Sequence, residues 1–211
     1  MPAPDTITTV THDPADSAPN DETAGSVVPP DRAARAAQQL RLVDLARDVE
    51  RHVATDGWDQ HPRLFALART ADLVALEPGL ADALGADAED PESLTPIEQD
   101  PIDTTRSLDE VLATTMWPDD VVGAALVLER LMLPPSAEGA LTNLPDDDAQ
   151  RLDEVVAAHP DRQDVRMAVV VTRDGQRICA VRLRSHDKDS EVLLGDNLVP
   201  RLADALDATF R

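Results

Sequence analysis

The sequence predicts an α+β fold in which amphipathic helices pack on a mixed, mainly antiparallel β-sheet. Three observations predict it. The central stretch Trp117–Pro135 is apolar almost throughout, and an Asp-Gly pair at 174–175 joins two apolar segments near the C-terminus. On both sides of these two features lie segments with helix-start and helix-stop signals that do not follow a regular βαβ alternation.

The stretch WPDDVVGAALVLERLMLPP, Trp117–Pro135, holds the longest apolar run in the chain. Apolar residues occupy both alternate sets of positions in its interior, so a strand there would be covered on both sides. A buried helix is the competing interpretation, because Ala, Leu, Glu and Met are good helix formers. The paired valines, Pro118 and the Pro134-Pro135 stop favour a central strand over 121–133.

The long first helix is expected from Asp31 to about Ala54, because Asp31 follows two prolines and can act as an N-cap. Its charged residues, Glu50 included, fall mostly outside the apolar stripe. That stripe should pack on the sheet, and consists of Leu42, Leu45, Ala46, Val49 and Val53.

Further elements follow from local signals. Ser107 and Glu110 form a capping-box pattern that predicts a helix over 108–116. Pro62 before the apolar segment Arg63–Arg69 suggests a strand near a sheet edge. The remaining expectations are a turn or strand over 72–76, helices over 77–84 and 197–210, a strand over 94–99, and a helix from about Pro145 to His159.

The Asp174-Gly175 pair predicts a hairpin with a type I′ turn between strands 165–172 and 177–184. A two-residue turn fixes the register, because each residue on one strand then has a defined partner on the other. It pairs Val171 with Ile178, and Met167 with Arg182.

Composition limits the classes of function. The chain has 211 residues and a formal net charge of −22, which argues against binding nucleic acid or an anionic membrane. Residues 1–30 contain acids but no Lys or Arg and are expected to form a disordered acidic tail. Residues 31–211 are then expected to form one α+β domain.

The single cysteine, Cys179, excludes an intrachain disulfide and suits a reducing compartment. No secretion signal or membrane-spanning run is present. Nucleotide fingerprints, phosphate-binding glycine loops and Ser/His/Asp signatures are absent too. We therefore expect a cytoplasmic protein without a cofactor.

Two sets of charged residues are candidates for chemistry. Asp59 and His61 could supply oxygen and nitrogen ligands to a divalent metal, although a turn with Gly57 and a capping Asp explains the same residues and is favoured. Glu129 and Arg130 interrupt the central strand on opposite sides of its backbone. If buried, Glu129 could serve as an acid, base or cation ligand; the alternative is that both residues form ordinary salt bridges.

The segment Asp161–Lys188 is the one net-positive stretch of the chain. Its arginines, Arg182 and Arg184 among them, could receive an acidic ligand or partner, or could instead bridge to acids on neighbouring helices. Trp58 is a candidate binding residue, although the favoured interpretation is a core anchor.

Four blocks of the chain together resemble a known family: GWDQHPRLFAL, LTPIEQD, WPDDVVGAALVLERLMLPP and HPDRQDVRMAVVVTRDGQRICAVRLR. It is an uncharacterised family of actinobacterial proteins first described from a Propionibacterium acnes open reading frame. The resemblance implies a bacterial cytosolic protein and supplies no catalytic residues. The order of elements is also similar, at the level of topology, to the fold of type III secretion chaperones.

These observations favour a non-enzymatic module that binds a protein partner, or a second copy of itself as a homodimer, through the hairpin and the far end of the central strand. The alternative is a metal-assisted or acid/base enzyme that uses Asp59 and His61 with Glu129.

Overall fold

A computed structural model describes residues 30–85, 90–134, 136–137 and 149–211. The predicted tail, residues 1–30, lies outside this part apart from Pro30, the first residue of α1. The strands are β1 (Arg63–Arg69), β2 (Leu94–Glu98), β3 (Val121–Met132), β4 (Gln163–Thr172), β5 (Arg177–Leu183) and β6 (Leu193–Gly195). The α-helices are α1 (Pro30–Ala54), α2 (Thr70–Leu76), α3 (Ala81–Leu84), α4 (Leu108–Thr114), α5 (Ala149–Ala158) and α6 (Pro200–Asp207).

Within the described residues the strands form one six-stranded sheet in the order β2-β1-β3-β4-β5-β6. Every neighbouring pair is antiparallel. The short segments η1 (Pro78–Leu80), η4 (Arg184–His186), η5 (Asp189–Glu191) and η6 (Ala208–Phe210) are 3₁₀ turns. The expected α+β class is confirmed. None of the described helices combines the length and apolarity that a bilayer crossing requires.

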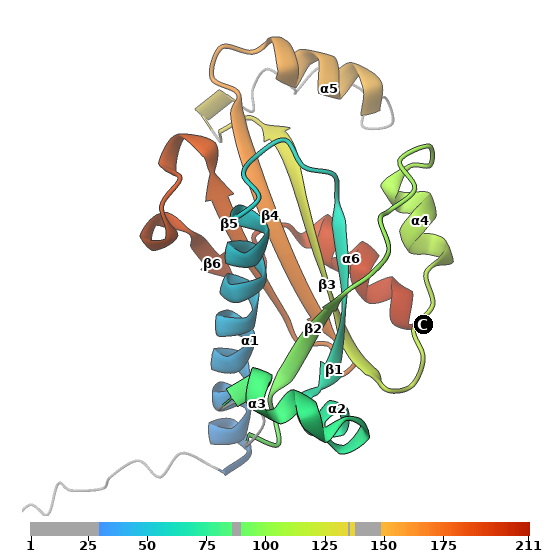
Figure 1. The fold of residues 1–211 in the computed structure, drawn as a ribbon. Helices are drawn as coiled ribbons and strands as arrows, with labels where there is room; N and C mark the ends of the chain where they lie inside the picture. The colour runs from blue at the N-terminus through green and yellow to red at the C-terminus, as the bar shows by residue number, and fades with distance from the viewer. Residues whose placement is uncertain (1–29, 86–89, 135, 138–148) are drawn as a thin grey trace, which may run out of the picture.

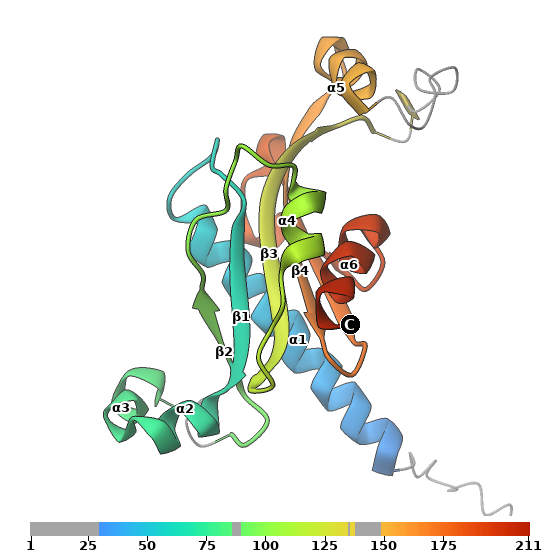
Figure 2. The same ribbon diagram turned by 90° about the vertical axis from the view of Figure 1, so that its right-hand side faces the viewer.

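The two faces of the sheet have separate covers. Helix α1 lies along one face, and α4 and α6 lie on the other (Figures 1 and 2). Under α1, the buried apolar residues include Leu42, Ala46, Val49, Phe65, Val127, Val170 and Ala180. Under α4 and α6 they include Leu64, Leu112, Leu126, Met167, Val169, Cys179 and Leu206. Burial on both sides explains why residues 123–128 of β3 and 167–171 of β4 are apolar at every position.

The central strand is confirmed. β3 lies between β1 and β4, and both alternate sets of its residues from Gly123 to Leu128 are buried. The competing helix is wrong because each side of this segment meets a separate core. The capping box is confirmed too: Glu110 N–H donates to Ser107 Oγ at 3.2 Å, and Ser107 N–H donates to Glu110 Oε2 at 3.0 Å.

Gly123 lets β3 approach β4 unusually closely. A Cβ at this position would lie 2.7 Å from the carbonyl oxygen of Val171 and 3.0 Å from Leu67 Cδ1. Side chains do not tolerate such contacts, so glycine is required here by close approach. The β1–β3 pairing shifts between Leu67 and Ala68, beside this point.

The β4–β5 hairpin exists, but its expected register was wrong by one residue. Thr172 N–H donates to Gln176 O at 3.0 Å, which leaves a three-residue loop, and Gly175 (φ 83°) is the one residue of that loop with positive φ. A type I′ turn would need positive φ at Asp174 as well. Consequently Arg166, not Met167, lies opposite Arg182.

One local expectation also needs correction. Residues 72–76 belong to helix α2, which starts at the buried Thr70 and carries Asp72 in its first turn, where a carboxylate is favoured. β1 lies next to the edge strand β2, in line with the expectation of a strand near a sheet edge, and Pro62 precedes β1 and so removes no ladder hydrogen bond. The edge is β2, which contains Pro96. The short opposite edge, β6, was not expected.

At one end of the sheet, β3 and β4 continue beyond β1. The pairing of β1 with β3 ends at Arg63 and Val127, whereas that of β3 with β4 continues to Met132 and Gln163. We call residues 128–132 and 163–167 the distal arm. Helix α5 lies at its end (Figures 1 and 2).

Candidate functional site

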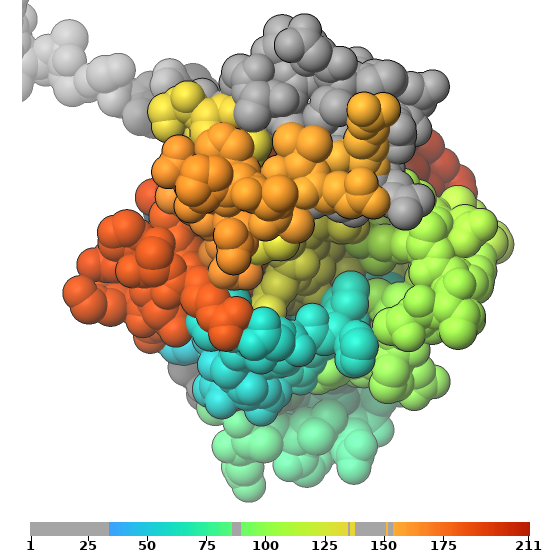
Figure 3. Space-filling view, turned by 90° about the horizontal axis from the view of Figure 1, so that it is seen from above, coloured from blue at the N-terminus to red at the C-terminus, as the bar shows by residue number. Residues whose placement is uncertain are grey.

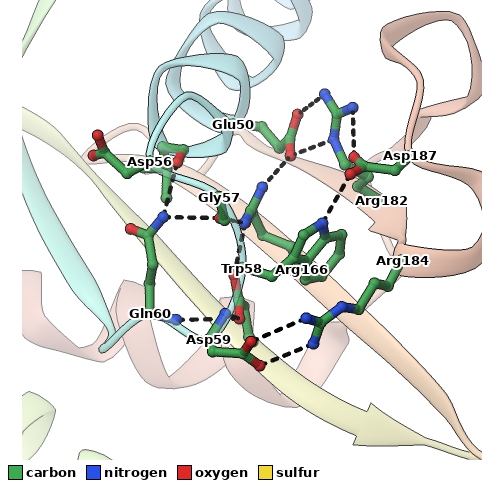
Figure 4. Close-up of polar contacts among 12 residues, drawn as sticks. Glu50, Asp56, Gly57, Trp58, Asp59, Gln60, Arg166, Arg182, Arg184 and Asp187 are labelled. Atoms are coloured by element: carbon green, nitrogen blue, oxygen red, sulfur yellow. Dashed lines mark hydrogen bonds and ion pairs between the residues drawn. The ribbon is translucent and has the colours of Figure 1, made fainter.

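A row of charged side chains crosses the sheet where the distal arm begins. Strand register places Glu129 of β3 opposite Arg166 of β4, and Arg166 opposite Arg182 of β5. All three lie on the α1 face, because Val127, Ala168 and Ala180, two positions away on each strand, belong to the core under α1. Glu50 reaches this row from α1 (Figure 4). We call these four residues the arginine network.

Glu50 is fully buried and joins both arginines. Its two carboxylate oxygens each accept a hydrogen bond of 2.7 Å from Arg182, from Nε and from Nη2. Arg166 Nη1 lies 3.6 Å from Glu50 Oε1. A carboxylate without water depends on such partners, because an unpaired buried charge is costly.

Arg166 is completely buried, with a relative exposure of 0 %. Its Nε and Nη2 donate to Glu129 Oε1 at 3.1 Å and 2.7 Å, and Nη2 also donates to the carbonyl of Gly57. The guanidinium carbon stacks 4.4 Å from the centre of the Trp58 ring. Cation–π stacking therefore covers the face that no carboxylate reaches.

The loop after α1 closes over this arginine. The backbone N–H groups of Asp59 and Gln60 donate to Glu129 Oε2 at 2.6 Å and 3.3 Å. The loop turns through two residues with positive φ, Gly57 at 85° and Asp59 at 69°. Asp tolerates this left-handed region better than most side chains. The sharp turn brings Trp58 onto Arg166.

A more exposed layer surrounds the network. Arg184 holds Asp59 with two hydrogen bonds of 2.9 Å. The Trp58 indole N–H donates to Asp187 Oδ2 at 2.9 Å. Arg182 donates to Asp187 at 3.2 Å and to Asp189 at 2.7 Å, in addition to Glu50.

These contacts shift pKa values in consistent directions. Hydrogen bonds to Glu50 raise the pKa of Arg182 above its ordinary value. The Arg184 guanidinium lowers the pKa of Asp59, and the Trp58 N–H lowers that of Asp187. Each of these three shifts favours the charged form of the group concerned.

The structure brings some of the candidate residues together and separates others. Trp58, Asp59, Glu129, Arg182 and Arg184 all belong to this cluster. His61 is exposed and has no place in it, and Arg130 is exposed on the opposite side of β3. Within the described residues no group of three or more His, Cys, Asp and Glu side chains is arranged to hold a metal ion.

Sequence reasoning did not single out the two residues at the centre: Glu50 was placed with the charged residues outside the apolar stripe, and Arg166 was only one of several arginines in the segment Asp161–Lys188. A signal for Glu50 was present: it lies four residues after Ala46 and three before Val53, within the apolar stripe. Arg166 shares its side of the strand with Ala168 and Val170. Each of these two residues is a charge on an otherwise apolar face, one on a helix and one on a strand that packs against it. This pattern was the available indication that the two charges are buried together.

The opposite side of the distal arm carries a pocket of about 250 Å³, which we call the arm pocket. It lies on the hollowed end of the molecule between the loop after α1, the segment before α4, and β3 (Figure 3). Its lining consists of Pro62, Ile102, Asp103, Thr104, Arg106, Leu108, Leu128, Glu129 and Arg130.

Comparison with known protein families identifies the family of this chain. The family described as PPA1309-like protein matches residues 42–211, which include the whole arginine network and the arm pocket. Comparison with curated proteins gives no match, and neither does comparison with solved structures. The likeness to type III secretion chaperones therefore has no matching structure behind it. The extent of the family match confirms the resemblance seen in the sequence, and the chain belongs to the PPA1309-like protein family.

Proposed function

We propose that this protein is a non-enzymatic, cytoplasmic module that binds a protein partner through its distal arm. The observation that carries the proposal is the exposure of three consecutive residues at the far end of β3, Arg130, Leu131 and Met132. Leu131 and Met132 are 38 % and 40 % exposed, although they continue the strand that forms the centre of the core. Because successive strand residues point to opposite faces, Met132 lies on the side of Arg130 and Leu131 on the side of Glu129. Each face of the arm's end therefore carries an exposed apolar side chain that a partner could cover.

The geometry of the arginine network supports a structural role rather than a catalytic one. Both oxygens of Glu129 accept hydrogen bonds from within the protein, and so do both oxygens of Glu50. Among the described residues no buried side-chain nitrogen or oxygen lacks a hydrogen-bond partner. A general base needs to lie within hydrogen-bond reach of the proton that it abstracts, and the hydrogen bonds that both carboxylates accept from the protein favour a structural role.

The contacts of the arginine network also indicate which residues of the surface are free to bind a partner. Arg182 is buried against Glu50, so this arginine of the hairpin is used internally. Arg184 is exposed but held by Asp59. The proposal therefore rests on the far end of β3 more than on the hairpin.

The acid/base alternative with Asp59, His61 and Glu129 has less support. The carboxylate of Asp59 is bound by Arg184 and that of Glu129 by Arg166, while His61 stands apart. Metal analysis of untagged protein, compared with a His61→Ala variant, tests this alternative. Stoichiometric metal that depends on His61 would favour it over partner binding.

Affinity purification of the full chain from its own cells tests the proposal. We expect wild-type protein to retain a partner that Leu131→Asp and Arg130→Glu lose. Leu40→Asp is the matched control, because Leu40 is 65 % exposed on α1, away from the arm. An unchanged set of retained proteins in all variants, or none with wild type, would contradict the proposal. Light scattering determines whether the partner is a second copy of the chain.

A further inference from the structure

The arm pocket has the size and lining of a site for one side chain. Four apolar residues form its base and walls: Pro62, Ile102, Leu108 and Leu128. Pockets for small-molecule ligands usually enclose about 300–1,000 Å³, and this one measures about 250 Å³. A single large apolar side chain from a partner suits it better than a cofactor.

The charges in the lining differ in what they can still bind. Its two carboxylates are already engaged: Glu129 by Arg166 and the loop N–H groups, and Asp103 by the hydroxyl and N–H of Thr105 at 2.6 Å and 2.9 Å. Hydrogen bonding by Thr105 lowers the pKa of Asp103, which keeps that carboxylate charged and bound internally.

The two arginines of the lining are in the opposite situation. Arg106 donates hydrogen bonds to two neutral oxygens, Glu110 O at 2.8 Å and Thr114 Oγ1 at 3.1 Å, and its charge also helps to lower the pKa of Asp103. Arg130 is exposed and makes no ion pair with any of the residues that the structure describes. This contrasts with Arg63, Arg166, Arg182 and Arg184, each of which is held by at least one carboxylate.

Resting on the proposed function, we infer that the arm pocket binds an acidic segment of the partner protein that inserts one large apolar side chain beside a carboxylate. The apolar side chain lies against Leu128, Ile102 and Leu108, and the carboxylate accepts hydrogen bonds from Arg130. Arginine suits this role because its planar fork binds a carboxylate with two parallel hydrogen bonds. Strand alternation places Met132 on the same side as Leu128 and Arg130, which extends the apolar contact along the arm.

A peptide selection tests this inference without assuming a partner. A random displayed-peptide library is selected on the full chain, and enriched peptides are measured by fluorescence anisotropy against wild type, Arg130→Glu and Arg201→Glu. Arg201 is the matched control, an exposed arginine on α6 outside the pocket lining.

We expect enriched peptides to combine a Leu, Phe or Met with an adjacent Asp or Glu. Loss of a charge-assisted hydrogen-bonded pair should weaken binding to Arg130→Glu about ten- to hundredfold, and Arg201→Glu should bind as wild type does. Replacing the peptide acid by its amide, or the apolar residue by Ala, should each weaken binding. Peptides without an acid, or with equal affinity for Arg130→Glu, would overturn the inference.

Two outcomes separate this inference from the proposed function. If Leu131→Asp abolishes partner capture while the selected peptides ignore Arg130, the arm binds a partner but the pocket does not anchor it. If a chain lacking residues 1–29 binds the peptides more tightly, and Arg130→Glu removes that gain, the chain's own acidic N-terminal segment is the occupant. That result would overturn the assignment to a separate partner.

Discussion

Glu50 and Arg182 form a two-bonded ion pair between helix α1 and strand β5, with both hydrogen bonds 2.7 Å long and neither side chain more than 3 % exposed. The pair joins residues 132 positions apart in the chain. It ties α1, the helix that covers one face of the sheet, to β5, the second strand of the hairpin, at the level where the distal arm starts.

Removing the Glu50 carboxylate should therefore lower the stability of the protein substantially. Glu50→Ala leaves Arg182 and Arg166 without their shared carboxylate in a buried place, and we expect the free energy of unfolding to fall by about 3–5 kcal/mol. Urea denaturation followed by circular dichroism measures it. Asp48→Ala, which removes an exposed ion pair with Arg51 on the same helix, should change it by less than about 1 kcal/mol. Similar values for the two variants would show that the buried pair contributes little.

Replacing both partners should cost less than the single substitutions predict. Glu50→Met with Arg182→Met removes the two buried charges together and leaves the contact between Arg166 and Glu129 in place. Because apolar residues of similar volume often substitute well for a buried ion pair, the double variant should be more stable than the sum of the singles by about 1–3 kcal/mol. A double-mutant cycle in urea gives this coupling, and strict additivity would refute it.

Lowering the pH should remove the stabilisation provided by the ion pair between Arg63 of β1 and Glu98 of β2. Hydrogen bonding by Arg63 lowers the pKa of Glu98 below its ordinary value. A carboxyl group whose pKa is lower in the folded state stabilises above its unfolded pKa, and the stabilisation is lost as the pH falls through the folded value. The stability difference between wild type and Glu98→Gln should thus be constant near neutral pH and shrink below about pH 4.3.

The size of that difference should be below about 1 kcal/mol, because the Glu98 side chain is 41 % exposed and water screens the pair. Urea unfolding at a series of pH values measures it for both proteins. A difference that grows toward low pH would reverse the sign of the assigned shift.

Cys179 should be unreactive in the folded protein. Its side chain is buried in the core under α6, and burial raises the pKa of the thiol, so little reactive thiolate forms. We expect a thiol reagent to modify it only at the rate of unfolding, with fast stoichiometric labelling in urea. Glu50→Ala should label faster than wild type. Rapid labelling of the native wild-type protein would contradict the assigned burial.

Much of the fold could be predicted because its signals are local. The apolar alternation of β3, the capping box of Ser107 and Glu110, and the glycine turn at Gly175 each act within a few residues. The hairpin register could not be predicted, because an Asp-Gly pair suits both a two-residue and a three-residue loop. The difference of one residue in loop length decides whether Met167 or Arg166 lies opposite Arg182.

The candidate site could be predicted only in part, for a related reason. Glu129, Arg182 and Trp58 were visible as unusual residues, but their partners come from segments far away in the chain. Glu50 was assigned to the polar sides of its helix because charged residues are rarely buried. Its burial is compensated by two arginines, whose positions depend on the pairing of three strands. No local pattern contains that information.

Gly123 sets the alignment on which these ion pairs depend. The same pairing of β3 with β4 that places Gly123 opposite Thr172 also places Glu129 opposite Arg166, six residues further along. A slip of one residue would bring a Cβ against the carbonyl of Val171 and would turn Glu129 toward the opposite core. Gly123 thus fixes the register of β3 against β4 near one end of the strand. That register determines that Glu129 meets Arg166 near the other end.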